Sequence, residues 1–448
     1  MKRFSFPALI LSCLLIVSCA PSLKHYPNIN QHLIKQDYDG AYKIVQESKK
    51  TYAERNAVLY YLDEGIISHY GGHYDVSNRS LSKSESMMEE LYTKSISKEA
   101  AAFMISDNTV PYRGEDFERA LVNLFMALNY VGMGYWEDAL VEARRVDNVL
   151  NVINSYYGED EKNVYKEDAF IRFIMGVLYE AEAEWNDAYI SYKKSRDIYE
   201  TDYLPNYGIS PPVLVIENLM SLTKALGYYS ELIELREKYP QVKVVDLSEK
   251  QKNAEIYIIH YNGLGPEKIE KYFLIPMPDA YIMKFAYPAF QKTGYQIAQG
   301  NVFLQNQAAE PIYASSTVMM EDISSLAVKN LENRIGRVKA KAVARATAKY
   351  LATKAAENEA EKRGGLLAGL VTRTVANVAS IATEQADLRH WRLLPAEIRV
   401  ARVMVPPGTY HGNIRFVSAS GSTIQTSEIQ PFDVKGQQKH FLIFRTLQ

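Results

Sequence analysis

Two stretches of this 448-residue chain share one spacing of small and aromatic residues, and that spacing restricts the fold more than any other feature. Each stretch ends at an alanine. A small residue lies 12 positions before this alanine, a tyrosine 9 positions before it, a second small residue 5 before it and a tryptophan 3 before it. The first set is Ala127, Tyr130, Gly134, Trp136 and Ala139, and the second is Gly176, Tyr179, Ala183, Trp185 and Ala188. Small residues let paired helices approach closely, so the spacing predicts stacked helix pairs over residues 31–240.

These offsets resemble those of the tetratricopeptide repeat, in which stacked helix pairs form a superhelix with a concave binding face. The resemblance implies a groove that takes a peptide or helix of a partner protein. The residues expected to contact the partner there are Glu118, Arg119, Asn129, Tyr130, Glu142, Arg144, Arg145, Tyr179 and Asn186. The alternative left open is that the charged residues form ion pairs between helices and that the tyrosines only pack.

After Pro240 the pattern changes from helix to strand. Short runs rich in β-branched and aromatic residues alternate with Gly and Pro turns, for example residues 243–245, 255–261, 397–405 and 440–445. Regularly spaced short strands indicate a β-sandwich of the immunoglobulin-like kind. A proline-free, alanine-rich segment interrupts them, and we expect a helical insertion over residues 317–383, either one long helix or a helical hairpin. The predicted fold class is therefore α+β multidomain, with a helical solenoid at 31–240 and a β-rich region at 241–448.

A basic stripe marks the first part of the insertion. Arg334, Arg337, Lys341 and Arg345 are separated by three or four residues, which places them on one helix face. Such a stripe is either a solvated helix face or a contact for anionic lipid headgroups, an envelope polymer or an acidic partner.

An apolar segment follows over residues 364–382, with Arg373 and Asn377 near its middle. A central arginine costs about 2.5–3.5 kcal/mol in a membrane span. We expect a helix that faces the core or a partner. The alternatives are a helix at the membrane interface and a membrane span.

The N-terminus has the pattern of an export signal. Lys2 and Arg3 precede a short apolar run at residues 8–17. The string Ile16-Val17-Ser18-Cys19 resembles the bacterial lipobox, which implies a signal peptide at 1–18, lipidation of Cys19 and a tether at 19–30. Ala20 after the cysteine favours the outer membrane, facing the periplasm, with display on the cell surface as the alternative.

The remaining composition excludes several classes of function. Both cysteines, Cys13 and Cys19, lie in the first twenty residues, so the body has no disulfide framework, Cys-ligated metal site or cysteine nucleophile. The chain has 51 Lys and Arg residues against 53 Asp and Glu residues. Its net charge therefore creates no positive electrostatic field that would attract nucleic acid. Phosphate-binding glycine loops and serine-hydrolase motifs are absent from the sequence. We predict no catalytic activity, no metal and no cofactor.

Longer strings resemble a family of uncharacterised bacterial lipoproteins with tetratricopeptide-like repeats and a β-rich C-terminal region. They are ERALVNLFMALNYVGMG (118–134), ALVEARRVDN (139–148), EDAFIRFIMGVLYEAEAEWNDAYISY (167–192) and EQADLRHWRLLPAEIRVARVMVPPGTY (384–410). The resemblance implies an envelope adaptor that binds another protein and supplies no catalytic residues. Two alternatives remain. One is a binder of, or enzyme acting on, peptidoglycan or an anionic envelope polymer, and the other is a structural tether of an envelope machine.

Overall fold

The N-terminal half consists of antiparallel helix pairs. The computed structural model describes residues 25–102, 107–155, 164–306 and 311–448. The pairs are α5 (Ala57–Tyr70) with α6 (Tyr74–Ala102), α7 (Asp116–Met133) with α8 (Trp136–Ser155), α9 (Ala169–Ala181) with α10 (Trp185–Ile198), and α12 (Val213–Ala225) with α13 (Tyr229–Lys238). Before them lie α2 (Tyr26–Ile34), α3 (Tyr38–Glu47) and α4 (Lys49–Tyr52), and short helices α11 (Leu204–Tyr207) and α14 (Leu247–Lys252) complete the set.

Small residues at the helix crossings explain the close pairing, as the sequence predicts. Ala139 and Ala188 are fully buried. A methyl group added to Gly65 would lie 2.6 Å from Leu81, and one added to Gly176 would collide with the Tyr192 ring. Carboxylates cap the helix starts: Asp168, for example, accepts a 2.7 Å hydrogen bond from the Ile171 amide.

The C-terminal half holds two four-stranded sheets and one two-stranded ribbon. The strands are β1 (Ala254–Asn262), β2 (Glu267–Pro276), β3 (Ile282–Gln291), β4 (Ile297–Asn306), β5 (Ile312–Ser316), β6 (Val318–Glu321), β7 (Glu397–Val405), β8 (Gly408–Ser418), β9 (Thr423–Val434) and β10 (Lys439–Thr446). The first sheet has the order β10-β1-β7-β6, the second has β5-β4-β8-β9, and β2 pairs with β3 alone. β1 runs parallel to β10 and antiparallel to β7.

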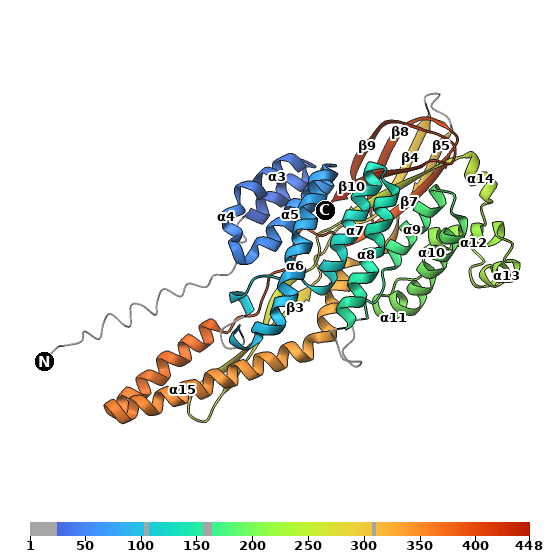
Figure 1. Ribbon diagram of the computed structural model, residues 1–448. Helices are drawn as coiled ribbons and strands as arrows, with labels where there is room; N and C mark the ends of the chain where they lie inside the picture. The colour runs from blue at the N-terminus through green and yellow to red at the C-terminus, as the bar shows by residue number, and fades with distance from the viewer. Residues whose placement is uncertain (1–24, 103–106, 156–163, 307–310) are drawn as a thin grey trace.

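Strand β1 separates two hydrophobic cores because its side chains alternate between the two faces of the sheet. Tyr257, Ile259 and Tyr261 belong to the core shared with the helices. Ile256 and Ile258 belong to the core between the two sheets. The fold is therefore layered as helices, first sheet, second sheet, and Figure 1 shows the helices lying across the strands.

Helix α15 (Ile323–Thr383) forms a projecting hairpin. Gly365 interrupts its helical backbone with a φ of 74°, a conformation that glycine adopts without the penalty of a side chain. The two halves fold back beside each other, and the β2–β3 ribbon packs along them through β3. Figure 1 shows this unit, the arm, extending away from the body.

The predicted fold class is confirmed: helical repeats precede a β-rich region with an inserted helical hairpin. Three boundaries differ from the predictions. Residues 26–30 belong to helix α2, where Ile29 is fully buried, so they are not part of a tether. Residues 318–321 form strand β6, and the insertion begins at Ile323. Residues 243–245 lie outside the strands. The predicted signal peptide, Cys19 and the start of the tether lie outside the described residues.

Candidate functional site

The chain's own first sheet covers the helix face on which a groove was expected. The Phe125 ring of α7 lies 5.7 Å from the rings of both Tyr261 and Trp391. Phe173 of α9 packs in the same way on Tyr257, with ring centroids 6.2 Å apart. The first helix of each of these pairs is therefore fixed against β1 and the segment before β7, and it offers no open groove to a partner.

Glu118 lies inside this junction. It is fully buried, and its carboxylate accepts hydrogen bonds from the Trp391 amide at 2.6 Å and from the Tyr112 hydroxyl at 2.5 Å. Burial raises the pKa of Glu118 to about 7. The prediction that Glu118 contacts a partner is wrong, because its carboxylate joins the repeats to the β-rich region. Trp391 is buried too.

Asn129 is likewise internal. Its amide nitrogen donates to Ser77 Oγ at 2.8 Å, and its oxygen lies 2.6 Å from His69 Nδ1. The other nitrogen of His69 lies 2.8 Å from the Tyr261 hydroxyl. Desolvation lowers the pKa of His69 to about 4. Asn129 is therefore a link between helix pairs and sheet, and its prediction as a partner contact is also wrong.

The other predicted groove residues lie at the edges and outer side of the repeats. Arg144 is exposed and donates to the Tyr179 hydroxyl at 2.5 Å, while Tyr179 itself is mostly buried. Arg145 is exposed and pairs with Glu142 at 3.2 Å and with Glu85 at 3.5 Å. The Arg145 pKa is raised by these two carboxylates, first by Glu142. Arg145, Glu142 and Glu85 therefore form a cluster of ion pairs between helices, which is the alternative that the sequence left open.

Three further residues of the predicted set are separate from one another. Arg119 is half-buried, with its guanidinium 4.2 Å from the Tyr92 ring. Tyr130 is half-buried at the end of α7, and burial raises its pKa. Asn186 is exposed at the start of α10. The structure thus brings Arg144 together with Tyr179 and Glu142 together with Arg145, and Tyr130 lies near the second pair.

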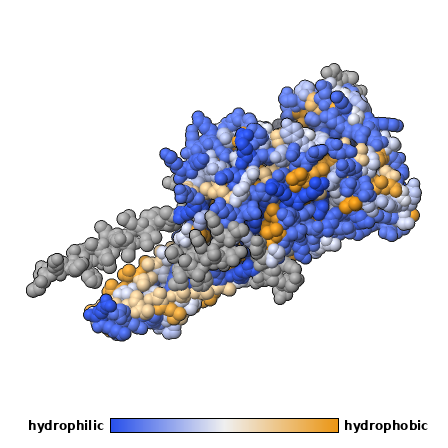
Figure 2. All heavy atoms as spheres, in the orientation of Figure 1, coloured by the Kyte–Doolittle hydropathy of each residue, from blue (hydrophilic) through white to orange (hydrophobic). Residues whose placement is uncertain are grey.

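The second helices of the repeats also carry exposed apolar side chains, on the same helices as the exposed residues of the predicted groove set. Val141 on α8 is 51% exposed and Ile190 on α10 is 52% exposed, and Ile233 on α13 is exposed as well. Val141 precedes Arg144 by one helical turn, and Ile190 follows Asn186 by one turn. We call Val141, Arg144, Asn186, Ile190 and Ile233 the outer helix face. Figure 2 shows small apolar areas of this kind on a mainly hydrophilic body.

The basic stripe of α15 is divided between internal and exposed positions, so neither prediction describes the whole stripe. Arg334 pairs with Asp116 of α7 and with Glu115, which caps the start of that helix, and burial lowers the pKa of Arg334 to about 10. Arg345 is buried and pairs with Glu384 at 2.7 Å. Arg337 is exposed and Lys341 is half-buried, and both also have interaction partners. The prediction of a contact with a polyanion is wrong for Arg334 and Arg345, because carboxylates of this chain already neutralise them.

A second cluster of charges is enclosed between the repeats and the first sheet. Lys250 contacts Glu180 at 2.5 Å, Lys439 contacts it at 2.8 Å, and Arg402 contacts Glu255 at 3.1 Å. Desolvation lowers the pKa of Lys439 to about 8. All five side chains are buried, so the cluster connects the two halves of the fold and is not accessible to a substrate. In the described part of the chain, no group of three or more His, Cys, Asp or Glu side chains could hold a metal ion.

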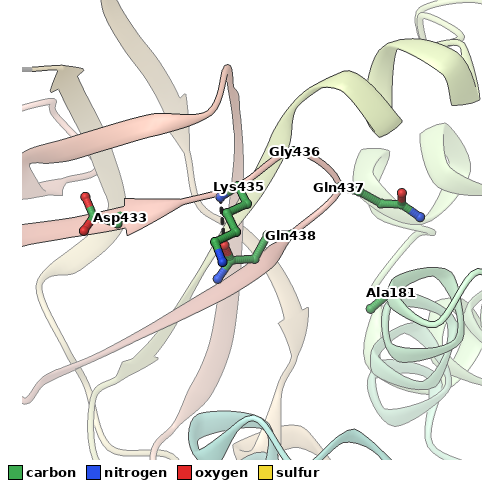
Figure 3. Close-up of a pocket in the computed structure, with 6 residues that line it drawn as sticks. All are labelled: Ala181, Asp433, Lys435, Gly436, Gln437 and Gln438. Carbon is green, nitrogen blue, oxygen red and sulfur yellow. Dashed lines mark hydrogen bonds between the residues drawn. The ribbon is translucent and has the colours of Figure 1, made fainter.

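A shallow surface depression lies where the end of α9 meets the turn between β9 and β10 (Figure 3). Its lining is Ala181, Asp433, Lys435, Gly436, Gln437 and Gln438. The Lys435 amide donates to the Gln438 side-chain oxygen at 2.8 Å, which closes the turn. The side chains drawn in Figure 3 do not converge on one point, so this depression is not a catalytic centre.

Solved structures similar to this chain are helical repeat proteins, and each matches about half of it. MamA aligns with 48% of this chain and 96% of its own, at 16% identity and a TM-score of 0.28. A putative kinesin light chain of Podosopora anserina with nearly identical TPR-like repeats aligns with 50% and 97%, at 12% identity and a TM-score of 0.34. A Rap protein in complex with competence and sporulation factor aligns with 50% and 55%, at 11% identity and a TM-score of 0.30.

No protein-family model and no curated protein matches the chain. At these identities and scores, the solved structures carry no argument about function. The helix pairs and their buried small residues define the class themselves: a helical repeat protein whose first helices are packed on a β-rich region of the same chain.

Proposed function

We propose that this chain is an adaptor of the bacterial cell envelope, without catalytic activity. Cys19 carries the lipid, the outer membrane holds the anchor, and the body faces the periplasm. The lipobox-like string ending at Cys19 and the basic and apolar segments before it support this location.

The outer helix face is the part proposed to bind another envelope protein. The observation that supports this assignment is the combination of exposed aliphatic side chains with arginine and asparagine on successive second helices. Val141, Ile190 and Ile233 supply apolar contacts that a partner can cover, and Arg144 supplies a charge at the rim. The first helices are unavailable because β1 covers them.

Site-specific photocrosslinking in cells tests this proposal. A photoreactive amino acid at Val141 or Ile190 is expected to capture one dominant envelope protein. The same amino acid at Glu428, an exposed residue of β9, serves as the matched control and is expected to capture none of it. Replacement of Arg144 by Glu is expected to weaken the crosslink while the protein remains folded.

The outcomes separate the three classes of function. Equal crosslinking at Glu428 and Val141 would show that the outer helix face is not the binding surface. Capture of glycan fragments alone would favour a polymer binder, and a fixed ratio of partner to chain would favour a structural tether. Cys19→Ala is expected to release the chain from the membrane fraction and to abolish the crosslink.

A further inference from the structure

The arm exposes a group of large aliphatic side chains. On the second half of α15, Leu367 is 76% exposed and Val378 is 64% exposed, with Val371 and Val375 between them. The first half contributes exposed Val343 and Leu351. We call these six residues the apolar arm face. Figure 2 shows apolar surface along the arm and a hydrophilic end, where Glu359, Lys362 and Arg363 are exposed.

The polar groups of the second half of α15 are used inside the arm. Arg373 pairs with Glu357 of the first half at 3.3 Å. Asn377 makes two hydrogen bonds with the backbone of Ile282, at 3.1 and 2.8 Å. The Thr374 hydroxyl donates to the Leu370 carbonyl of its own helix at 2.9 Å. Water-facing helices ordinarily carry charges on the exposed side, whereas here the charge and the amide point inward and the aliphatic groups point outward.

The β2–β3 ribbon extends this apolar surface. Phe273, Leu274 and Ile275 of β2 are all exposed. β2 pairs only with β3 within the described sheets, so its outer edge carries unpaired backbone groups. Open sheet edges do not occur inside the hydrocarbon of a bilayer. That edge and the charged end of the arm therefore favour a position at the membrane interface over a complete crossing.

The composition of α15 and the short chain between Cys19 and the body both favour a lipid surface as the partner of the apolar arm face. α15 is the one helix in the described part of the chain that is long and apolar enough to cross a membrane, with a mean hydropathy of 1.4 over an 18-residue stretch that is only 11% buried. If Cys19 is lipidated, as proposed above, the body lies close to the bilayer, because Cys19 and His25 are separated by at most about 20 Å of extended chain. Tyr26 contacts Arg392, which follows the end of α15 at Thr383 by nine residues. The first described helix and the segment that follows the arm are therefore in contact.

We propose that the apolar arm face rests in the interface of the membrane that holds the lipid anchor. The aliphatic side chains enter the boundary between headgroups and acyl chains, in the manner of an amphipathic helix at a membrane surface. The anchor and the arm together hold the body in one orientation. This inference depends on the proposed lipidation of Cys19 but not on the identity of the protein partner.

The test is a depth-dependent fluorescence measurement on the full lipidated chain. Because both native cysteines lie at positions 13 and 19, Val375→Cys introduces the single free thiol of the mature lipidated form. A fluorescent label there is reconstituted into phosphatidylethanolamine and phosphatidylcholine vesicles, with and without doxyl-labelled lipid. Ile312→Cys on β5 is the matched control, since Val375 is 53% exposed and Ile312 is 60% exposed.

The Val375 label is expected to lose about half of its emission to the doxyl lipid, and the Ile312 label to lose almost none. The quenching should persist in high salt and without anionic lipid, because the apolar arm face carries no charge. An equal fractional loss of emission to doxyl lipid at both positions would overturn the proposal. So would a Val375 label whose emission changes with protein concentration, as contact with a second copy would cause, but does not change with doxyl lipid.

Failure of the anchor is distinguishable from failure of the arm. Mass spectrometry of the N-terminal peptide reports whether Cys19 carries acyl chains, and their absence would contradict the proposed location. In that case Cys13 and Cys19 are replaced by serine, so that Val375→Cys is again the single free thiol, and the labelled chain is mixed with preformed vesicles to report on the arm. A quenched Val375 label would then support the arm without the anchor.

Discussion

The side chain of Glu118 in the repeats caps the backbone of Trp391, 273 residues later, with a hydrogen bond of 2.6 Å. These two residues belong to the two most distinctive strings of the sequence, ERALVNLF and RHWRLLPAEI. The strings therefore form one structural junction. In this junction Glu118 also accepts from Tyr112 and from the Glu115 amide, so its carboxylate serves three donors.

Glu118→Ala is expected to destabilise the protein strongly. The substitution leaves the Trp391 amide and the Tyr112 hydroxyl buried without an acceptor, and we expect a loss of about 3 kcal/mol in the free energy of unfolding. Urea denaturation at neutral pH measures this change. Asn186→Ala on the exposed start of α10 is the control and should change stability by less than about 0.5 kcal/mol. A similar loss in both variants would contradict the capping role of Glu118.

His69 is expected to make stability depend on pH between about 6.5 and 4. Its pKa is lowered to about 4 in the folded chain and is near 6.5 when unfolded. The unfolded state therefore binds the proton first, so the stabilisation is complete above pH 6.5 and is lost as pH falls towards 4. The difference amounts to about 3 kcal/mol. His69→Gln should reduce the slope of the melting temperature with pH in this range without removing it, because burial also lowers the pKa of His390 to about 3. His73→Gln, at an exposed position, should leave the slope unchanged.

Two glycines in helices are expected to respond oppositely to alanine. Gly176→Ala places a methyl group into the Tyr192 ring and should cost about 1–3 kcal/mol. Gly336 in α15 has no neighbouring atom within reach of an added methyl group, and Gly336→Ala should increase stability by about 0.5–1 kcal/mol. Thermal denaturation of both variants tests the helix crossing. Stabilisation by Gly176→Ala would show that α9 and α10 are farther apart than described.

Arg345→Ala is expected to destabilise the junction of the arm and body. It leaves the buried carboxylate of Glu384 with Lys349 as its remaining basic contact, at 2.7 Å, and we expect a loss of about 3 kcal/mol. Lys362→Ala at the exposed end of the arm should be neutral within about 0.5 kcal/mol. A stable Arg345→Ala chain that no longer binds anionic vesicles would instead restore the polyanion hypothesis for this residue.

Local patterns in the sequence predicted the parts of the fold that depend on near neighbours. The spacing of Ala139 and Ala188 predicted close helix crossings because each crossing involves residues of one helix pair. The β-branched and aromatic residues of β1 predicted a strand for the same reason. The hairpin form of α15 was left open, since Gly364-Gly365 is compatible with a continuous or a broken helix.

Contacts between distant segments could not be predicted in this way. Arg334 has the spacing of a surface stripe, and only the fold brings Glu115 to it across more than two hundred residues. Glu118 and Asn129 are polar residues of amphipathic helices, and their burial depends on a sheet that the repeat pattern does not include. Ile190 was missed for the opposite reason, because a single aliphatic residue on a polar helix face gives no periodic pattern.

Strand β10 imposes an order on the biosynthesis of this protein. It pairs in parallel with β1 and carries the buried side chains Lys439 and Arg445. Until β10 has been synthesised, one edge of β1 is open and Glu180 lacks one of its two lysine partners. The helix pairs can form earlier, but the layer that covers them is complete only when nearly the whole chain is available. The first sheet is therefore completed only after residues 439–446 have been synthesised, later than any of the helix pairs can form.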